Sequence, residues 1–214
     1  MNQEQSRPAN PILSDAARNR LIDSRLTPNA ISMVGLLGNL AAVGFIFAGW
    51  WIPAGLAFVF GSVMDLLDGK YSRMSGKATL FGAFLDSSLD RIEEGFVLAA
   101  IAWQFARGGD DWAATAVVLA VTGSIMVSYT RARAEALGIE CKVGIASRAV
   151  RVVIISVGLF LADLTIDDTE LFVLKAAIYL LAVMSLFTML QRIWHVYKQS
   201  KILDAANELD GQSA

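Results

Sequence analysis

Residues 65–91 read DLLDGKYSRMSGKATLFGAFLDSSLDR, and this stretch joins the end of one apolar segment to the start of the next. Asp65 and Asp68 are three residues apart at the end of the first segment. Asp86 and Asp90 are four residues apart at the start of the second. On a helix, both spacings place the two side chains on one face, one turn apart. The stretch therefore predicts two helices that each present a pair of carboxylates near the same end.

Long apolar runs flank this stretch on both sides and make up most of the chain. Of the 214 residues, 55% are hydrophobic and 18% are charged, whereas an average soluble domain is roughly 45–50% apolar and about 25% charged. A helix needs about 20 mostly apolar residues to cross about 30 Å of hydrocarbon. The sequence therefore predicts an all-α integral membrane protein with six transmembrane helices. The six runs cover residues 30–51, 52–67, 84–104, 112–129, 152–161 with its flanks, and 171–193.

The positively charged residues predict how the chain lies in the membrane. If it crosses six times, all of the 18 Lys and Arg residues except Arg107 and Lys175 fall on one side. By the positive-inside rule that side is the cytoplasm, so both termini and the paired aspartates face it in a cell membrane. The formal net charge of −2 lacks the basic balance of a nucleic-acid-binding protein. The N-terminus has no charged start followed by an apolar core and a cleavage site, so we expect no removable signal peptide.

Three segments are expected along the chain: a cytoplasmic arm over residues 1–26, a six-helix domain over residues 27–199, and a cytoplasmic tail over residues 200–214. Within the arm, residues 12–26 read ILSDAARNRLIDSRL, with apolar side chains at three- and four-residue spacing. This pattern predicts an amphipathic juxtamembrane helix that lies on the membrane surface. An ordinary solvent-exposed linker helix would show the same spacing.

Four carboxylates that converge near a membrane boundary repel one another unless they share a cation, and oxygen ligands favour Mg²⁺, Mn²⁺ or Ca²⁺ over zinc or copper. Gly69 and Gly82 leave room beside the aspartates. Arg73 and Lys77 offer positive charge to phosphate oxygens. These are the parts that phosphoryl transfer requires. The alternative is that the aspartates only form ion pairs with Arg73, Lys77 and Arg91.

The same stretch resembles the signature of the CDP-alcohol phosphotransferase family, which is D-x-x-D-G-x-x-A-R, eight residues, then G-x-x-x-D-x-x-x-D. Every fixed position matches except the alanine, which is Ser72 here. Members of this family are six-helix membrane enzymes, typically homodimers, that move a substituted phosphoryl group from a CDP-alcohol to a second alcohol and release CMP. The resemblance therefore implies a homodimeric transferase of phospholipid biosynthesis that uses Mg²⁺ or Mn²⁺.

The resemblance also implies a role for each residue of the signature. Asp90 would be the catalytic base that takes the proton of the incoming hydroxyl. The metal ligands would be Asp65, Asp68, Asp86 and Asp90. The CDP-alcohol would lie against Pro28, Asn29, Ala30, Ile31, Gly69, Arg73, Thr79 and Gly82.

Basic residues outside the signature bear on the choice of acceptor alcohol. Arg151 and Arg192 lie close to apolar runs, where an unpaired guanidinium is expensive, so a bound phosphate would satisfy both. Plain positive-inside topology accounts for many of the other positive charges without any ligand. Three segments are similar to bacterial phosphatidylinositol-phosphate synthases: 128–138 (SYTRARAEALG), 144–154 (GIASRAVRVVI) and 190–196 (LQRIWHV).

That subfamily joins CDP-diacylglycerol to inositol 1-phosphate and binds the acceptor phosphate with basic residues. The resemblance places this role on Arg131, Arg151 and Arg192, and we add Arg148, which lies three residues before Arg151 on one helix face. Arg131 stands where lysine is common, and Ser147 and Val150 stand where acidic residues often occur. The expected partners are CDP-diacylglycerol, inositol 1-phosphate, membrane lipid and a second copy of the chain, with no nucleic acid.

Other functions stay open at this point. Glycerol 3-phosphate or serine would serve as acceptor in the same reaction, although serine would leave the arginines without an anion. A divalent-cation transporter would also place aspartates at helix ends, but it gives no reason for the glycines and the arginine at matching positions. A membrane scaffold would need neither metal nor nucleotide.

Overall fold

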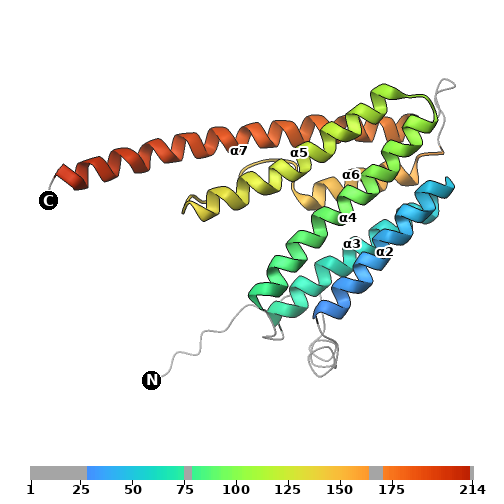
Figure 1. The fold of residues 1–214 in the computed structure, drawn as a ribbon, viewed down its shortest axis with the longest axis horizontal. Coiled ribbons are helices and arrows are strands. Elements are labelled where there is room, and N and C mark those ends of the chain that lie inside the picture. The colour runs from blue at the N-terminus through green and yellow to red at the C-terminus, as the bar shows by residue number, and fades with distance from the viewer. Residues whose placement is uncertain (1–27, 75–78, 164–170, 213–214) are drawn as a thin grey trace.

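The structure is a computed structural model that describes residues 28–74, 79–163 and 171–212. These residues form six helices and no strand, so the all-helical prediction is confirmed. The predicted amphipathic helix over residues 12–26 lies outside the described residues. The helices are α2 (Pro28–Ala48), α3 (Trp51–Met74), α4 (Leu80–Arg107), α5 (Asp111–Ala136), α6 (Arg148–Phe160) and α7 (Phe172–Gln212), one for each predicted apolar run (Figure 1).

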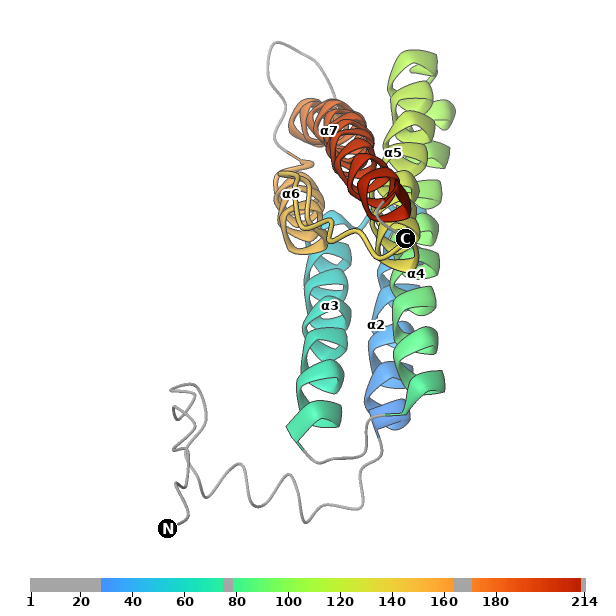
Figure 2. The same cartoon turned by 90° about the vertical axis from the view of Figure 1, so that its left-hand side faces the viewer.

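The six described helices form a closed ring of neighbours. Each packs against two others in the order α2, α3, α6, α7, α5, α4 and back to α2, and α3 also touches α4. Figure 2 shows α2, α3 and α4 side by side, with α6 and α7 above α3. Since the order around the ring differs from the order along the chain, α3 and α6 meet although two helices separate them in sequence.

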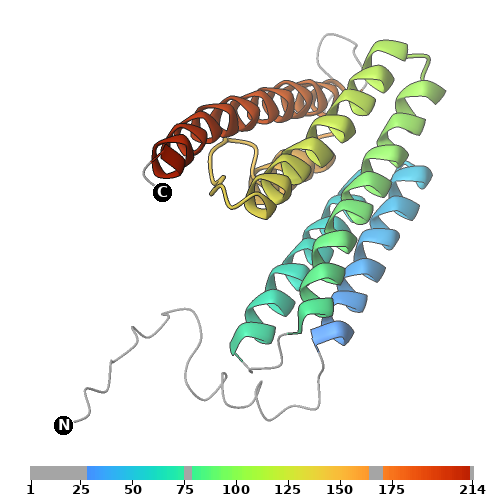
Figure 3. The same cartoon turned by 60° about the vertical axis from the view of Figure 1, so that its left-hand side comes forward.

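One end of the bundle gathers the helix ends that carry signature residues or expected nucleotide contacts. α2 begins there, α3 ends there and α4 begins there (Figures 2 and 3). Thr79 starts α4 as its N-cap, because its Oγ1 accepts a hydrogen bond from the backbone N–H of Gly82 at 2.9 Å. Such a cap satisfies one of the amides that a helix leaves free at its start.

The helix lengths agree with a protein that lies in a membrane. Among the described residues, three helices are long and apolar enough to cross it: Ala30–Ala48, Asp111–Ala136 and Phe172–Ala205. The apolar part of α3, Trp51–Leu67, is shorter. The 13 residues of α6 extend only about 20 Å, which is less than the hydrocarbon thickness. Six complete crossings therefore stay a prediction.

Apolar side chains both fill the bundle and cover its outside. Ile46, Leu98 and Leu181 are fully buried between helices. Leu37 and Val183 leave 61% and 67% of their surface exposed on the outer faces. Large apolar patches of this kind suit contact with lipid rather than with water.

The last helix, α7, is 41 residues long and runs on past the rest of the bundle toward the C-terminus (Figure 1). It continues without a break to Gln212. The predicted boundary between the domain and its tail, after residue 199, thus falls inside one helix.

Candidate active site

Two aspartates of the signature meet at one arginine. Asp65 lies on α3, Asp90 lies on α4, and Arg148 is the first residue of α6. Arg148 Nη2 lies 2.7 Å from Asp65 Oδ2 and 2.8 Å from Asp90 Oδ1. The side chain of Asp65 is only 5% exposed and that of Asp90 only 18%, so little water screens this contact. Packing of α6 on α3 brings together charges that are 83 positions apart in the chain.

The other two aspartates belong to the same helices. Asp86 lies one turn before Asp90 on α4, close enough for the two charges to interact. Asp68 lies one turn after Asp65 on α3, and its side chain is outside the part that the structure describes. Among the described side chains, no three His, Cys, Asp or Glu residues are close enough to form a metal site.

The residues present nevertheless fit a divalent ion. The oxygens of Asp65 and Asp90 converge on a single cationic nitrogen of Arg148. The positive charge of this nitrogen stands in for that of a metal ion. Carboxylate oxygens are the ligands that Mg²⁺ and Mn²⁺ prefer. Asp68, one turn after Asp65 on α3, would be a further ligand.

A fifth carboxylate, which the sequence analysis did not single out, lies behind this pair. Glu93 is 2% exposed, and its Oε2 accepts a hydrogen bond of 2.6 Å from Asn39 Nδ2. The same oxygen is 4.0 Å from Arg148 Nη2. In this part of the structure, Glu93 Oε1 and Asn39 Oδ1 are buried without a hydrogen-bond partner. The signal in the sequence is an acid three residues after Asp90, where a helix brings it to the same face.

Small residues make room for this cluster. A Cβ on Gly35 would collide with Asp65 Oδ1, and a Cβ on Gly61 would lie 2.7 Å from the amide nitrogen of Asn39. Any side chain at either position would push a polar group of the site aside. From the sequence, Gly35 is interpreted as a close-packing position of a membrane helix, and Gly61 was missed.

The residues predicted to bind the CDP-alcohol lie at one end of the bundle. Pro28, Asn29, Ala30 and Ile31 form the first turn of α2, Gly69 and Arg73 lie in the last turns of α3, and Thr79 and Gly82 start α4. The side chains of Pro28, Asn29 and Arg73 are outside the described part. Thr79 has a structural role as the cap of α4.

Arg151 already has a counter-charge within the protein. Its guanidinium is 2% exposed, and Nε and Nη2 each lie 2.7 Å from an oxygen of Glu94. Its Nη1 also donates to the carbonyl of Ala146 at 3.0 Å. A bound phosphate is therefore not needed to neutralise Arg151. The guanidinium keeps one further hydrogen on each of Nη1 and Nη2 for a ligand.

Arg192 differs, because its hydrogen-bond partners among the described residues are carbonyl groups. It is 6% exposed, its Nε donates to the carbonyl of Val143 at 2.9 Å, and its Nη1 donates to that of Val127. Within the described part of the chain, no carboxylate lies within ion-pair distance of Arg192. The positive charges of Arg131 and Arg151 and the negative charge of Glu135 act on it from further away. Three guanidinium groups, two of them paired with Glu135 and Glu94, therefore lie around α7, against which both α5 and α6 pack.

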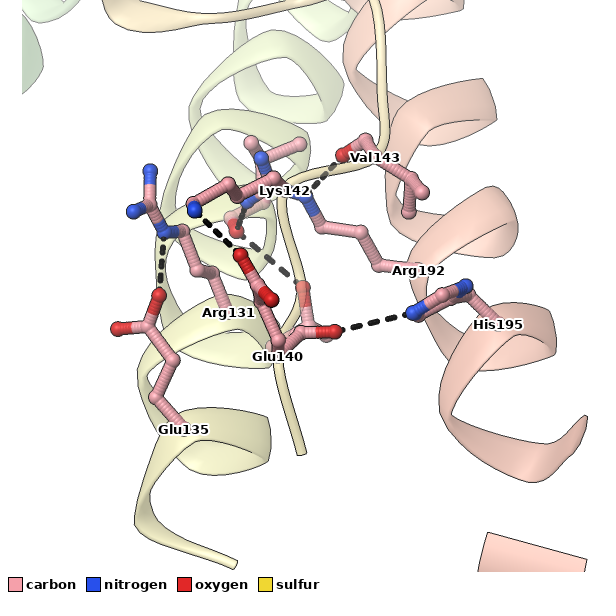
Figure 4. A network of polar contacts seen from close by, with 9 residues as sticks. Arg131, Glu135, Glu140, Lys142, Val143, Arg192 and His195 are labelled. Atoms are coloured by element: carbon pink, nitrogen blue, oxygen red, sulfur yellow. Dashed lines mark hydrogen bonds and ion pairs between the residues drawn. The ribbon is translucent and has the colours of Figure 1, made fainter. Parts of the chain in front are cut away.

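The third member of this cluster, Arg131, is half exposed. Its Nε lies 2.8 Å from Glu135 Oε1, one turn further along α5. Figure 4 shows Arg131 on α5 and Arg192 on α7, on either side of the segment that carries Glu140, Lys142 and Val143. An anion between these helices would meet positive charge from both sides.

The segment between α5 and α6, residues 137–147, is tied to one face of α7. Thr188 Oγ1 accepts hydrogen bonds from the amides of Ile145 and Ala146, at 3.2 and 3.0 Å. Arg192 binds the carbonyl of Val143, and His195 Nε2 lies 3.0 Å from the carbonyl of Glu140. These contacts fix the start of α6, and with it the positions of Arg148 and Arg151.

Gly144 lets this segment pass close to α7. Its φ of +117° lies in a region that favours glycine, and a Cβ there would collide with Thr188 Cγ2. Sequence analysis missed both Gly144 and Thr188. Their contact joins residues 44 positions apart, and no local pattern signals it.

Comparison with known proteins places the whole bundle among relatives. A family model described as CDP-alcohol phosphatidyltransferase matches residues 25–198. Archaetidylinositol phosphate synthase of Methanothermobacter thermautotrophicus is 39% identical over 176 residues, which cover 82% of this chain and 86% of the relative. Phosphatidylinositol phosphate synthase of Streptomyces avermitilis is 34% identical over 202 residues, which cover 90% and 81%.

Solved structures agree with the sequence relatives. Crystal structures of phosphatidylinositol phosphate synthase of Mycobacterium tuberculosis match with a TM-score of 0.75 at 30% identity, one with CDP-DAG bound and one in complex with manganese and citrate. Each match covers 84% of this chain, and 91% and 87% of the respective neighbours.

Proposed function

Because the chain belongs to the CDP-alcohol phosphatidyltransferase family, we propose that it transfers the phosphatidyl group of CDP-diacylglycerol to a hydroxyl of inositol 1-phosphate. The products are phosphatidylinositol phosphate and CMP. Relatives named for inositol phosphate products and a neighbour with CDP-DAG bound support this reaction. The observation that carries the proposal is the convergence of Asp65 and Asp90 from α3 and α4.

Asp65, Asp68, Asp86 and Asp90 would hold a divalent ion, Mg²⁺ or Mn²⁺, and the ion supplies charge neutralisation of the diphosphate. A neighbour in complex with manganese supports a metal of this class. The residues at the ends of α2, α3 and α4 that the family resemblance assigns to the nucleotide would then border it. They are Pro28, Asn29, Ala30, Ile31, Gly69, Arg73, Thr79 and Gly82.

Asp90 would act as the general base. Its carboxylate is exposed enough to reach a substrate hydroxyl, whereas Asp65 is almost fully buried. As the acceptor oxygen bonds to the phosphorus that carries the diacylglycerol, the bond from that phosphorus to CMP breaks, and the hydroxyl proton passes to the Asp90 carboxylate. A positioned base of this kind contributes about 10²–10⁴-fold to the rate.

The acceptor phosphate would lie among Arg131, Arg151 and Arg192, with Arg148 at its edge. A buried guanidinium with no carboxylate within ion-pair distance in the described part of the chain, as at Arg192, favours an anionic ligand. This argument supports inositol 1-phosphate or glycerol 3-phosphate over serine, and the names of the relatives support the inositol compound.

The protein is a membrane protein by its apolar helices and its family. We further expect it in the cell membrane as a multi-pass homodimer, with both termini and the site at the cytoplasmic face. The basic arm and the basic connections of the sequence support this orientation.

The experiment that tests the reaction is CMP release by the purified protein with Mg²⁺. CDP-diacylglycerol and its archaeol counterpart are offered as donors, because the relatives' names differ in the lipid. Inositol 1-phosphate, glycerol 3-phosphate, inositol and serine are offered as acceptors. CMP release with inositol 1-phosphate alone supports the proposal. CMP release with another alcohol instead would make that alcohol the acceptor. No CMP release with any donor and acceptor would contradict the proposed transferase activity.

Asp90→Asn is measured beside the wild type, and it should lower kcat by at least about 10²-fold. Asp111→Asn is the matched control. Asp111 is exposed in the first turn of α5, at the opposite end of α4 from the site, so its amide variant should keep wild-type activity.

A further inference from the structure

Arg148 contacts the carboxylate cluster and lies three residues before Arg151 of the arginine cluster on α6. A single nitrogen of its guanidinium, Nη2, contacts Asp65 and Asp90 and lies 4.0 Å from Glu93. Its side chain is 31% exposed, so it has room to change position. Arg151, three residues on, is 3% exposed and is held by both oxygens of Glu94. Only Arg148 of these two has the freedom to move between two sets of anions.

A divalent ion and this guanidinium would compete for the same oxygens. Mg²⁺ binds carboxylate oxygens at about 2.0–2.1 Å, so an ion shared by Asp65 Oδ2 and Asp90 Oδ1 would lie close to the point that Arg148 Nη2 takes. Two cations at such a distance repel strongly where little water screens them. Occupation of the two carboxylates by metal therefore requires the guanidinium to leave.

The member of the arginine cluster that follows Arg148 on its own helix is Arg151. Arg148 and Arg151 lie on the same face at the start of α6, and Arg192 lies near Arg151. Arg131 and Arg151 already have carboxylate partners, whereas Arg192 has no carboxylate within ion-pair distance in the described part of the chain. A further guanidinium beside Arg192 is therefore unfavourable unless an anion is bound. The phosphate of the acceptor supplies that anion, and a guanidinium binds it with two parallel hydrogen bonds.

We propose that Arg148 is a switch that couples the two substrates: metal binding with the donor displaces Arg148 from Asp65 and Asp90, and the freed guanidinium then helps to bind the acceptor phosphate. This rests on the proposed function, since it takes an acceptor with a phosphate group. It goes beyond that function because it makes metal and acceptor binding cooperative. By linkage, each ligand tightens the binding of the other by the same factor.

The first test measures Mn²⁺ binding by electron paramagnetic resonance, with no substrate present. Arg148→Gln removes the competing cation, so its Mn²⁺ dissociation constant should fall by about tenfold or more relative to the wild type. Its inositol 1-phosphate affinity should become weaker and independent of Mn²⁺. An unchanged or weaker Mn²⁺ affinity overturns the switch.

Arg131→Gln is the matched control. It removes the same charge from the arginine cluster, but Arg131 contacts Glu135 and neither of the two aspartates. Its Mn²⁺ affinity should equal that of the wild type. If both variants tighten Mn²⁺ equally, the effect is a general change of charge, and the switch is overturned.

The wild type gives a second test that does not depend on a variant. Saturating inositol 1-phosphate should tighten Mn²⁺ binding, and saturating Mn²⁺ should tighten inositol 1-phosphate binding by the same factor. Absence of this coupling overturns the switch. CMP release measured on the same preparation separates the two proposals. CMP release without coupling between Mn²⁺ and inositol 1-phosphate binding contradicts the switch alone. Coupling without CMP release contradicts the proposed reaction.

Discussion

At the scale of single residues, Gly35 leaves space for the carboxylate of Asp65. The buried carboxylate of Asp65 occupies the space in which a side chain of Gly35 would lie. Gly35→Ala should therefore displace Asp65 and raise the Mg²⁺ concentration needed for half-maximal activity at least about tenfold, because a ligand of the metal moves. The measurement is CMP release against Mg²⁺ concentration.

Gly44→Ala, on the same helix α2, is the control for this substitution. A Cβ on Gly44 meets nothing within 4 Å. Its Mg²⁺ dependence should stay as in the wild type, and the better helix propensity of alanine should raise the free energy of unfolding by up to about 1 kcal/mol. Equal effects of the two variants would show that space beside Asp65 is not the cause.

Also at this scale, Glu94 and Arg151 form a buried pair whose roles in stability and in binding can be separated. Glu94→Ala should lower the free energy of unfolding by about 3–5 kcal/mol, since it leaves a buried guanidinium without its carboxylate. The double variant Glu94→Leu with Arg151→Leu should recover most of that stability. The KM of the double variant for inositol 1-phosphate should still be raised at least about tenfold. Its KM for the donor should change little.

Thermal unfolding and the two KM values check this prediction. A double variant with the wild-type KM for the acceptor would contradict a role for Arg151 in acceptor binding. A double variant as unstable as Glu94→Ala would contradict the explanation by an uncompensated charge.

At the scale of the elements, the hydroxyl of Thr188 ties the segment 137–147 to α7. Thr188→Val keeps the shape but leaves the amides of Ile145 and Ala146 without their acceptor, which costs about 1–3 kcal/mol. We expect faster hydrogen exchange at these two amides and a raised KM for the acceptor, because the start of α6 loosens. Thr122→Val is the control, since Thr122 is hydrogen-bonded only to Val118 of its own helix α5. The same exchange rates in both variants would refute this role of Thr188.

A second contact at this scale joins the starts of α5 and α7. Asp110 caps α5 through the amide of Ala113 at 3.0 Å and pairs with Lys175 at 2.8 Å. The hydrogen bond from Lys175, and next that from Ala113, lower the pKa of Asp110 below its usual value. A carboxyl with a lowered pKa stabilises the fold above the pKa of the unfolded chain, about 3.9 for Asp, and loses that contribution as the pH falls through the lower native value.

We expect the ion pair to contribute little to stability, because it is partly exposed and screened by solvent. The difference in Tm between the wild type and Asp110→Asn, which keeps a capping oxygen, should be constant from pH 7 to about pH 5 and should shrink below about pH 4. Thermal unfolding over this pH range checks it. A difference that grows as the pH falls would have the wrong sign for this explanation.

At the scale of the whole molecule, the membrane orientation gives a direct prediction. The native Cys141 is buried and is replaced by Ala to remove background labelling. Single cysteines are then placed by Glu140→Cys, Ser213→Cys and Asp111→Cys, and intact cells are treated with an impermeant thiol reagent. Only Asp111→Cys should be labelled from outside, because the other two positions lie on the basic side. Labelling of Glu140→Cys alone would contradict six crossings with this orientation.

The sequence by itself determined the local features of this protein. Each apolar run predicted one helix, and all six helices are present in the described part of the chain. The pairs Asp65 with Asp68 and Asp86 with Asp90 follow from helix spacing alone, as does the signature that led to the family. Spacing within one helix depends only on backbone geometry, so these features can be read without the fold.

The tertiary structure decided which charges meet. Arg148 contacts Asp65 and Asp90 rather than lying wholly among the arginines, Arg151 pairs with Glu94, and Arg192 has no carboxylate beside it in the described part. These partners are 57 to 83 positions apart. They meet because the order in which the helices pack around the bundle differs from their order along the chain. The packing order is set by the fit between whole helix faces. No short stretch of sequence reports that fit.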